Sequence, residues 1–585
     1  MFIKKDKKSL FSISISNSFF NKSFFSFILK FFGIIQIIVL VFFVYMAVAL
    51  DKEEIKTLIH SVAQQTYWFG KMLTNLPVKW SNKISSNHPI LNLEIAPRDY
   101  QLLMTLKEDA IKVGQRLPKH SKKIPAVINY KNDKFDVKIR LKGDNPDEHL
   151  DNLKWSMRIE VNAGRFLSMH TFNLQHPMRR SYMGSFILHK FTENENLTTK
   201  KYYLIPVSIN GKYIGVYNYE EVPDHNMNER LTGVKNVVLF IDDNEVWSDK
   251  YHSHLLTGPT SNKHGTFLHL VVDNYYNNVI KAHSFREVLN DRVLKKDFER
   301  ASKLLNGYRT GHLSASEVFD INKVAVWLAM TDLFGANHGD KDFNLKIVYD
   351  RDLDRIYPII WDAFTGNVFG SVTFHRYNLF KFEHIYRATP REGYQLFAWQ
   401  FIVQLLEDQN VLEKYLAKLD EITAPGYIDE VMKIIKPQVD EYMNILHLDY
   451  PEFKVEDEIK RLKENAEYLR GVFLYSEFPF YAYLSEDNKQ DNLILVNKKP
   501  VPIKIIELVD ISTGQYFKVK GADSDFILKH IIPGIPTTPA KVFFECPMED
   551  CFNGRKIENL RVKAKVVGTS KSTSIKINNW SAYAQ

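Results

Sequence analysis

The sequence predicts an α+β fold that follows an N-terminal transmembrane helix and precedes a C-terminal all-β domain. Residues 31–50 contain no charged side chain and are long enough to cross a bilayer as one helix. Alternating strand patterns recur between residues 91 and 220, and helical patterns recur between residues 262 and 474. From about residue 491, short apolar runs alternate with turn residues, which is typical of a β-sandwich.

Composition narrows the class of protein. The 585 residues leave room for more than one core, and 45% hydrophobic with 25% charged residues is ordinary for a globular protein. The formal charge of +8 is spread over many lysines rather than gathered into a basic stripe with aromatic residues, so no nucleic-acid partner is expected. The two cysteines, Cys546 and Cys551, could close a small loop in an oxidising compartment and are otherwise free thiols.

These patterns divide the chain into segments. We expect five: a cytoplasmic tail (1–30), a transmembrane helix (31–50), a helical stalk (51–89), a main domain (90–474) and a β-sandwich-like accessory domain (475–585).

The lysine-rich tail favours a cytoplasmic N-terminus, which makes the chain a single-pass inner-membrane protein with a periplasmic or extracellular body. Ala47-Val48-Ala49 has the form of a signal-peptidase site. The apolar run is longer than a usual signal core, which favours an uncleaved anchor. Either version sends the body outward.

The candidate active site lies between residues 337 and 369. Polar side chains stand before a predicted hairpin and at its far end: His338, Asp340, Asp342, Asn344 and Asp362. Antiparallel strands joined by a short turn lie about 5 Å apart, so Asn344 and Asp362 are expected to meet. Two hard oxygen ligands so placed suit Mg²⁺. The alternative is an acidic, solvated loop that caps a buried strand.

A predicted strand at residues 154–161 carries a cationic face. Its alternation places Lys154 and Arg158 on the face opposite Trp155, and Arg140 and Lys142 end the preceding strand beside a glycine turn. Such a face next to a glycine-containing turn is a common way to hold nucleotide phosphates. The alternative is a solvated strand face.

Residues 202–209 and 213–220 predict a β-hairpin. Asn210-Gly211 between two alternating apolar runs is the strongest short-range hairpin signal. The second strand runs into Glu221.

Four motifs follow one another along the main domain: R-L-K-G-D-N at 140–145, K-W-S-M-R-I at 154–159, I-N-G-K-Y-I-G-V-Y-N-Y-E-E-V at 209–222, and the stretch from Asn344 to Trp361-Asp362. In this order they resemble the spore-coat protein H (CotH) kinase family over roughly residues 90–450, and the chain is similar to a membrane-anchored bacterial member of it. The resemblance implies an atypical protein-kinase-like two-lobe fold: an N-lobe of strands with one helix, a hinge and a helical C-lobe. It also implies ATP and Mg²⁺ or Mn²⁺ as cofactors.

The resemblance assigns roles to individual residues. It implies nucleotide binding by Arg140, Lys142, Lys154 and Glu221, metal binding by Asn344 and Asp362, and catalysis by Asp340. Relative to the kinase pattern H-R-D-x-x-x-x-N, Asp340 and Asn344 are four residues apart rather than five. Asp342 is therefore the alternative catalytic carboxylate.

Two functions remain open at this point. The first is a membrane-anchored, ATP-dependent phosphotransferase that acts on a protein or another hydroxyl acceptor. The second is a non-catalytic cell-envelope module whose partner belongs to exopolysaccharide or cell-surface assembly. Export of the body would separate it from cytoplasmic ATP, which favours the second function. The motifs favour the first.

Overall fold

The computed structural model describes the chain from residue 88 onward, with gaps. The described ranges are residues 88–113, 116–143, 154–242, 275–336, 338–364, 400–475, 479–484, 492–497, 501–520, 526–528, 540–545 and 555–579. The expected cytoplasmic tail (1–30), transmembrane helix (31–50) and nearly all of the stalk (51–89) lie outside them, as does the pair Cys546 and Cys551. Within these ranges no helix is both long and apolar enough to cross a membrane.

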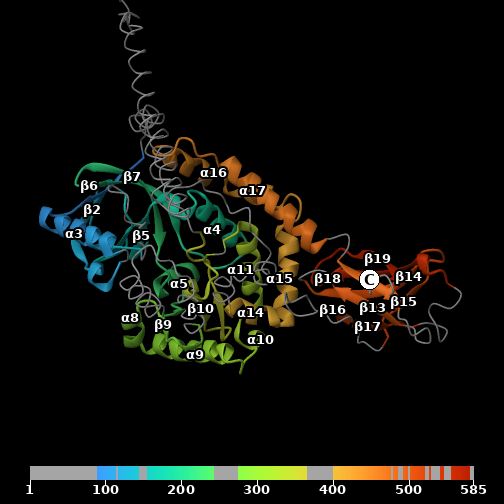
Figure 1. Ribbon diagram of the computed structural model, residues 1–585. Helices are drawn as coiled ribbons and strands as arrows, with labels where there is room; N and C mark the ends of the chain where they lie inside the picture. The colour runs from blue at the N-terminus through green and yellow to red at the C-terminus, as the bar shows by residue number, and fades with distance from the viewer. Residues whose placement is uncertain are drawn as a thin grey trace, which may run out of the picture. The chain divides into compact units, whose positions relative to one another are not determined.

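The first strands form a closed barrel with the order β1-β2-β3-β4-β5-β7-β6. Figure 1 labels four of them, β2, β5, β6 and β7. They are β1 (Leu91–Glu94), β2 (Ile124–Tyr130), β3 (Asp133–Leu141), β4 (Met157–Val161), β5 (Thr171–Gln175), β6 (Tyr202–Ile209) and β7 (Lys212–Glu221). Most neighbours are antiparallel. The exception closes the barrel, because β1 pairs in parallel with β6 and places Leu91 opposite Val207.

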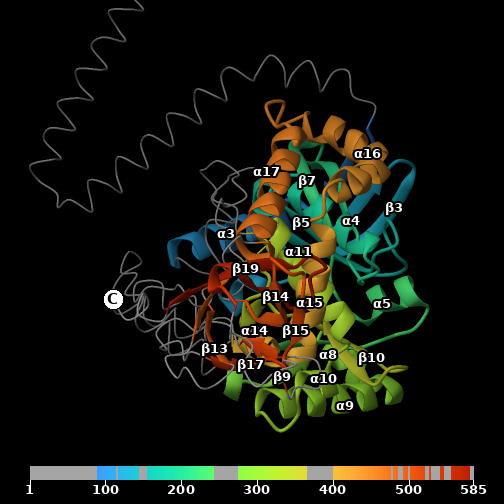
Figure 2. The same ribbon diagram turned by 90° about the vertical axis from the view of Figure 1, so that its right-hand side faces the viewer.

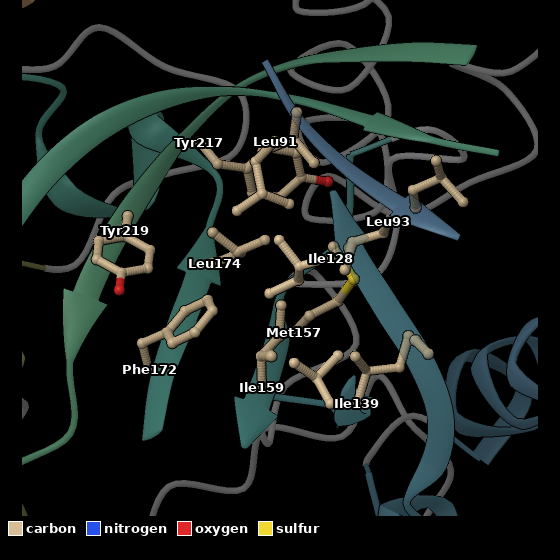
Figure 3. Packing of buried hydrophobic residues seen from close by; sticks show 14 of the residues in the cluster. Leu91, Leu93, Ile128, Ile139, Met157, Ile159, Phe172, Leu174, Tyr217 and Tyr219 are labelled. Atoms are coloured by element: carbon tan, nitrogen blue, oxygen red, sulfur yellow. The ribbon is translucent and has the colours of Figure 1, made fainter. Parts of the chain in front are cut away.

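Apolar side chains from alternate positions of these strands fill the barrel. Figure 3 shows them converging from different strands: Leu91, Leu93, Ile128, Ile139, Met157, Ile159, Phe172, Leu174, Tyr217 and Tyr219. Trp155, Met157, Ile159 and Val161 all belong to this core, which confirms the alternation predicted for residues 154–161. Polar residues at the intervening positions therefore face away from the core.

The predicted hairpin at residues 202–220 is confirmed. Asn210 and Gly211 form the turn between β6 and β7 with φ values of 49° and 78°. Asparagine and glycine tolerate positive φ better than other residues, and such turns match the twist of paired strands. The Asn210 side chain also bonds the backbone of Ile95 in both directions, at 2.8 and 3.0 Å.

Helices lie beside the barrel. α3 (Pro97–Val113) contacts β2 and β3, while α4 (Gly184–Asn194) and α16 (Tyr427–Leu446) contact β6. A short 3₁₀ helix, η3 (Pro177–Arg180), joins β5 to α4 and contacts β7.

A four-stranded sheet with the order β11-β10-β8-β9 follows the barrel. Its strands are β8 (Val238–Ile241), β9 (Ile280–Ala282), β10 (Ile347–Asp350) and β11 (Arg355–Pro358).

The helical elements of this part are α5 (His225–Thr232), α8 (Phe285–Asn290), α9 (Arg292–Arg309), α10 (Ala315–Val318), α11 (Ile321–Phe334), η4 (Asp342–Asn344), α14 (Gln400–Glu407), α15 (Gln409–Ile422), α17 (Val455–Tyr468) and η5 (Leu469–Leu474). α11 lies beside α15 in both views (Figures 1 and 2). Every residue of α11 from Val324 to Phe334 is buried, as expected of a helix that is mostly apolar on all its faces.

The expected two-lobe, protein-kinase-like fold is wrong. The strands of the supposed N-lobe close into a barrel, and the supposed helical C-lobe contains a four-stranded sheet. The closure depends on the parallel pairing of β1 with β6, which joins residues far apart in the chain and leaves no local sequence signal. Strand β9 lies within the region of helical patterns that begins at residue 262, because its short apolar run does not distinguish strand from helix.

The described part of the C-terminal region consists of strands and one 3₁₀ helix, η6 (Ile557–Asn559). The strands are β12 (Phe480–Leu484), β13 (Asn492–Asn497), β14 (Ile503–Asp510), β15 (Tyr516–Lys518), β16 (Phe526–Leu528), β17 (Ala540–Phe543), β18 (Leu560–Val566) and β19 (Thr573–Asn579). They pair along one path, β15-β14-β18-β19-β12-β13-β17, with β16 also on β14. The sequence predicts a β-sandwich-like domain here, and among the described strands the parallel pair β12–β19 joins them all along one hydrogen-bonded path.

Candidate active site

The hairpin of β10 and β11 delivers Asp362 to the loop that precedes it. The strands pair from Ile347 opposite Pro358, and the Ile359 N–H donates to the Lys346 carbonyl at 2.9 Å. Just beyond, the His338 N–H donates to the Ala363 carbonyl at 3.3 Å. The two segments therefore touch through their backbones.

Gly339 permits this close approach. A Cβ atom added to Gly339 would clash with the Trp361 carbonyl and lie 3.1 Å from the Ala363 Cα. Asp362 itself has a φ of 45°, an uncommon conformation for a residue other than glycine. Strained backbone of this kind is concentrated at functional sites.

The Asp362 carboxylate lies between two basic groups. Its Oδ1 is 2.5 Å from Arg180 Nη1, and its Oδ2 is 3.6 Å from His338 Nε2. Burial alone would raise the pKa of Asp362, but Arg180 and then His338 outweigh it and hold the pKa well below its usual range. The side chain is still 26% exposed. Asp362 is therefore an ionised carboxylate that a ligand can reach.

Arg180 connects Asp362 to a buried acid on the barrel wall. Its Nε and Nη2 donate to Glu220 at 3.1 and 3.3 Å, and Lys200 Nζ contacts the same carboxylate at 2.7 Å. Burial would raise the pKa of Glu220, yet the neighbouring cations, Arg180 first, lower it below its usual range. Burial lowers the pKa of Lys200, whose ammonium also lies 4.3 Å from the Trp361 ring centroid.

Glu220 belongs to a row of polar residues across the outer face of the barrel. The strand registers place neighbours side by side in this order: Arg140, Arg158, Asn173, Glu220 and Tyr202. Arg158 Nε donates to the Asn173 amide oxygen at 2.9 Å, and the Asn173 amide donates to Glu220 at 3.2 Å. Hydrogen bonds therefore extend from the cationic strand of the barrel to Asp362 through Glu220 and Arg180.

Lys142 is the predicted nucleotide-binding lysine that lies near this group. Its positive charge lowers the pKa of both Glu220 and Asp362, although each pKa shift has larger causes. The Lys142 N–H donates to the Ser156 carbonyl at 3.0 Å, which fixes the end of β3. Arg140 precedes Leu141, the last residue of β3, and donates to the Leu141 carbonyl at 3.0 Å.

Lys154 lies in a different group of residues. Its ammonium contacts Asp449 at 2.8 Å and the Tyr450 hydroxyl at 3.1 Å, and both follow the end of α16. Asp449 also accepts the Val216 N–H at 2.7 Å. A side chain at Gly215 would run into this pair, because an added Cβ would lie 2.5 Å from Lys154 Nζ. Lys154 therefore connects the barrel wall to the segment after α16.

The four remaining predicted site residues are Asn344, Asp342, Asp340 and Glu221, and most of them are buried. Asn344 Nδ2 donates to the His338 carbonyl at 2.9 Å, so Asn344 belongs to the same loop as His338. Asp342 is fully buried and accepts the Phe401 N–H in the first turn of α14 at 3.1 Å. Asp340 is 1% exposed. Glu221 accepts the Lys201 N–H at 3.0 Å.

Asp362 and Asn344 carry oxygen donors of the type that a magnesium ion bound together with phosphate uses, and both Asp362 oxygens lie beside basic groups. Such ions commonly take one or two protein carboxylates and complete their coordination with water and substrate phosphates. Asp362 and Asn344 supply one carboxylate and one amide. In the part of the chain that the structure describes, no cluster of three or more His, Cys, Asp or Glu side chains is arranged to hold a metal.

Sequence reasoning missed Arg180, Lys200 and Glu220. The signal for Glu220 was present, because Tyr217 and Tyr219 of β7 face the core and the alternation places Glu220, not Glu221, on the outer face. Arg180 lies in a short 3₁₀ helix next to Ser181, whose φ is 53°. No periodic pattern marks such a position. No family model matches this chain, and no curated protein is similar to it at a significant level.

Proposed function

We propose that this chain is a phosphotransferase that moves the terminal phosphoryl group of ATP to a hydroxyl group of a protein or another acceptor. The observation that carries the proposal is Asp362, an ionised carboxylate with part of its side chain exposed between Arg180 and His338. Phosphoryl transfer depends mostly on positioning and on neutralising negative charge. In this proposal the Asp362 carboxylate positions a metal ion, and the metal ion with the nearby cations neutralises the charge.

Each residue near Asp362 has a role in this proposal. Asp362 and Asn344 would hold Mg²⁺ or Mn²⁺, which neutralises charge on the phosphates when bound. Arg180 fixes the orientation of the Asp362 carboxylate, since it binds Asp362 and the buried Glu220 at once. Lys142 is the cation that we place nearest the phosphates, because its charge acts on Asp362. Lys154 is committed to Asp449.

The acceptor base is Asp340 in this proposal. Asp340 belongs to the loop that contacts residues 361–363, whereas Asp342 binds the backbone of α14. Because Asp340 is 1% exposed, an acceptor hydroxyl reaches it only if the loop moves when substrate binds.

We place this activity on the outer side of the cell membrane, where the reaction depends on ATP that has left the cytoplasm. The support is the lysine-rich segment 1–30 followed by the uncharged run 31–50. An alkaline phosphatase fused after residue 90 should be active in cells, and an inactive fusion would place the body in the cytoplasm.

Transfer of labelled phosphate tests the function. The purified full chain is incubated with γ-labelled ATP, Mg²⁺ or Mn²⁺ and a generic protein acceptor. Asp362→Asn should reduce transfer by about a hundredfold or more, because an amide holds the charge-neutralising metal ion less tightly than a carboxylate does. Asp352→Asn, in the exposed β10–β11 turn, is the matched control and should transfer at the wild-type rate. Transfer that survives Asp362→Asn would contradict this site, and a folded wild-type chain without transfer or nucleotide binding would favour the non-catalytic envelope module.

A further inference from the structure

A second surface, away from Asp362 in the sequence, combines exposed apolar and basic side chains. It comprises the end of the segment before β9, helix α8 and the solvent face of helix α9, which we call the α8–α9 surface. α8 and α9 contact each other and lie side by side in both views (Figures 1 and 2). Nothing in the proposed phosphotransfer reaction uses this surface.

The apolar part is unusually exposed for its residue types. The exposed fractions are 64% for Val279, 37% for Phe285, 41% for Leu289 and 50% for Val293. Phe285 and Leu289 are four residues apart on α8 and therefore share one helix face. Val293 follows in the first turn of α9. Together these side chains place an apolar edge at the start of α9.

The basic part follows the helical repeat of α9. Arg292, Lys295, Lys296 and Lys303 are all exposed and lie at positions i, i+3, i+4 and i+11 of one face. Among the described residues, none of the four forms an ion pair with a carboxylate. A basic face on an amphipathic helix beside exposed apolar side chains is typical of a helix that lies on a membrane surface.

Nearby acids offset only part of this charge. Glu299 is exposed at position i+7 of the same face, and the other three acids have partners of their own. Asp291 accepts the N–H groups of Val293 and Leu294 as the N-cap of α9. Asp297 is buried and binds Arg351. Glu287 lies 3.3 Å from His225 Nε2.

We propose that the α8–α9 surface docks on anionic lipid headgroups. Basic side chains would contact the phosphates, and Phe285, Leu289 and Val293 would enter the boundary between headgroups and acyl chains. A nucleic acid would also attract the basic face, but it offers no apolar phase for three exposed aliphatic and aromatic side chains. The apolar edge is therefore what favours a lipid surface over a nucleic acid.

A local probe tests this docking in the full chain. Cys546→Ser and Cys551→Ser remove the natural thiols, Val293→Cys introduces one, and an environment-sensitive fluorophore is attached to it. Vesicles of phosphatidylcholine containing phosphatidylglycerol should shift the emission to the blue, and added salt should weaken the effect. The same fluorophore on Thr513→Cys, exposed in the turn between β14 and β15, reports any contact that does not involve α8–α9.

Charge reversal separates docking from other lipid contacts. Each basic residue near an anionic surface raises affinity about fivefold, so Lys295→Glu with Lys296→Glu should weaken the α9 response about twentyfold or more. The control variant Lys414→Glu with Lys433→Glu makes the same change in charge at two exposed lysines outside α8 and α9. It should leave the response of the Val293 probe unchanged. An unshifted Val293 probe, an equal shift on pure phosphatidylcholine, or a shift that survives the α9 reversal would each overturn the proposal. So would a response to RNA or DNA without one to vesicles.

Discussion

Arg180 binds Asp362 and Glu220 at once, and so joins the end of the β10–β11 hairpin to the wall of the barrel. The Arg180 guanidinium is buried. Burial lowers its pKa, but the carboxylates of Asp362 and Glu220 outweigh burial and raise the pKa above its usual value. A planar guanidinium with several fixed donors suits this bridging role better than an ammonium does. The position of Asp362 therefore depends on a buried charge network that the hairpin does not itself contain.

Glu220 should be the most costly member of this network to neutralise. Glu220→Gln leaves Arg180 and Lys200 buried with one carboxylate fewer, and breaking such a pair typically costs about 3–5 kcal/mol. Because folding lowers the pKa of Glu220 from 4.5, its contribution is complete above about pH 4.5 and is lost as the pH falls below that value. Urea unfolding at neutral and acidic pH measures this. Wild type should lose stability more steeply in acid than Glu220→Gln, and parallel curves would contradict the assignment.

Substitution of Lys154 should lower stability, whereas substitution of Lys142 should weaken nucleotide binding. Lys154→Met leaves Asp449 buried without its ammonium partner, so it should lower the free energy of unfolding by about 3–5 kcal/mol. Lys142 is only half-buried, and Lys142→Met should weaken nucleotide binding with little loss of stability. Denaturant unfolding and nucleotide titration of both variants distinguish the two roles. A Lys154→Met variant of normal stability with weakened nucleotide binding would restore Lys154 to the site.

Glu458 should make the protein less stable as the pH rises. Burial raises the pKa of this carboxyl to about 8, although Arg461 opposes the shift. The pKa of this carboxyl is higher in the folded state than its value of 4.5 in the unfolded chain. Its contribution to the stability of the folded state is therefore complete below about pH 4.5 and is lost as the pH rises toward 8. Glu458→Gln should therefore be more stable than wild type at pH 8 by more than about 1 kcal/mol. Glu456→Gln, exposed on the same helix, should show no such gain.

Local signals predicted the parts of the fold that depend on neighbouring residues. The Asn210-Gly211 turn, the alternation of residues 154–161 and the hairpin that ends at Asp362 all appear in the structure. Each depends on turn chemistry or on a period of two, which a short stretch of sequence contains in full.

Long-range pairings could not be predicted in the same way. Lys154 and Asp449 are separated by 295 residues, and the β1–β6 pairing that closes the barrel joins residues 91–93 to 207–209. Neither leaves a periodic trace in the chain. Without them, Lys154 was expected at the active site and the strands were expected to form a separate lobe.

Binding of Mn²⁺ with ATP tests the central claim most directly. Free Mn²⁺ gives a solution electron paramagnetic resonance signal that weakens when the ion is bound, so titration reports formation of the metal–nucleotide complex on the protein. We expect binding by the wild-type chain, loss of at least about tenfold in affinity for Asp362→Asn, and no change for Asp352→Asn. Among the described residues, Asp362 is the partly exposed carboxylate beside Arg180 that we assign to the metal ion. Equal binding by the wild type and Asp362→Asn, or none by a folded wild-type chain, would contradict the account.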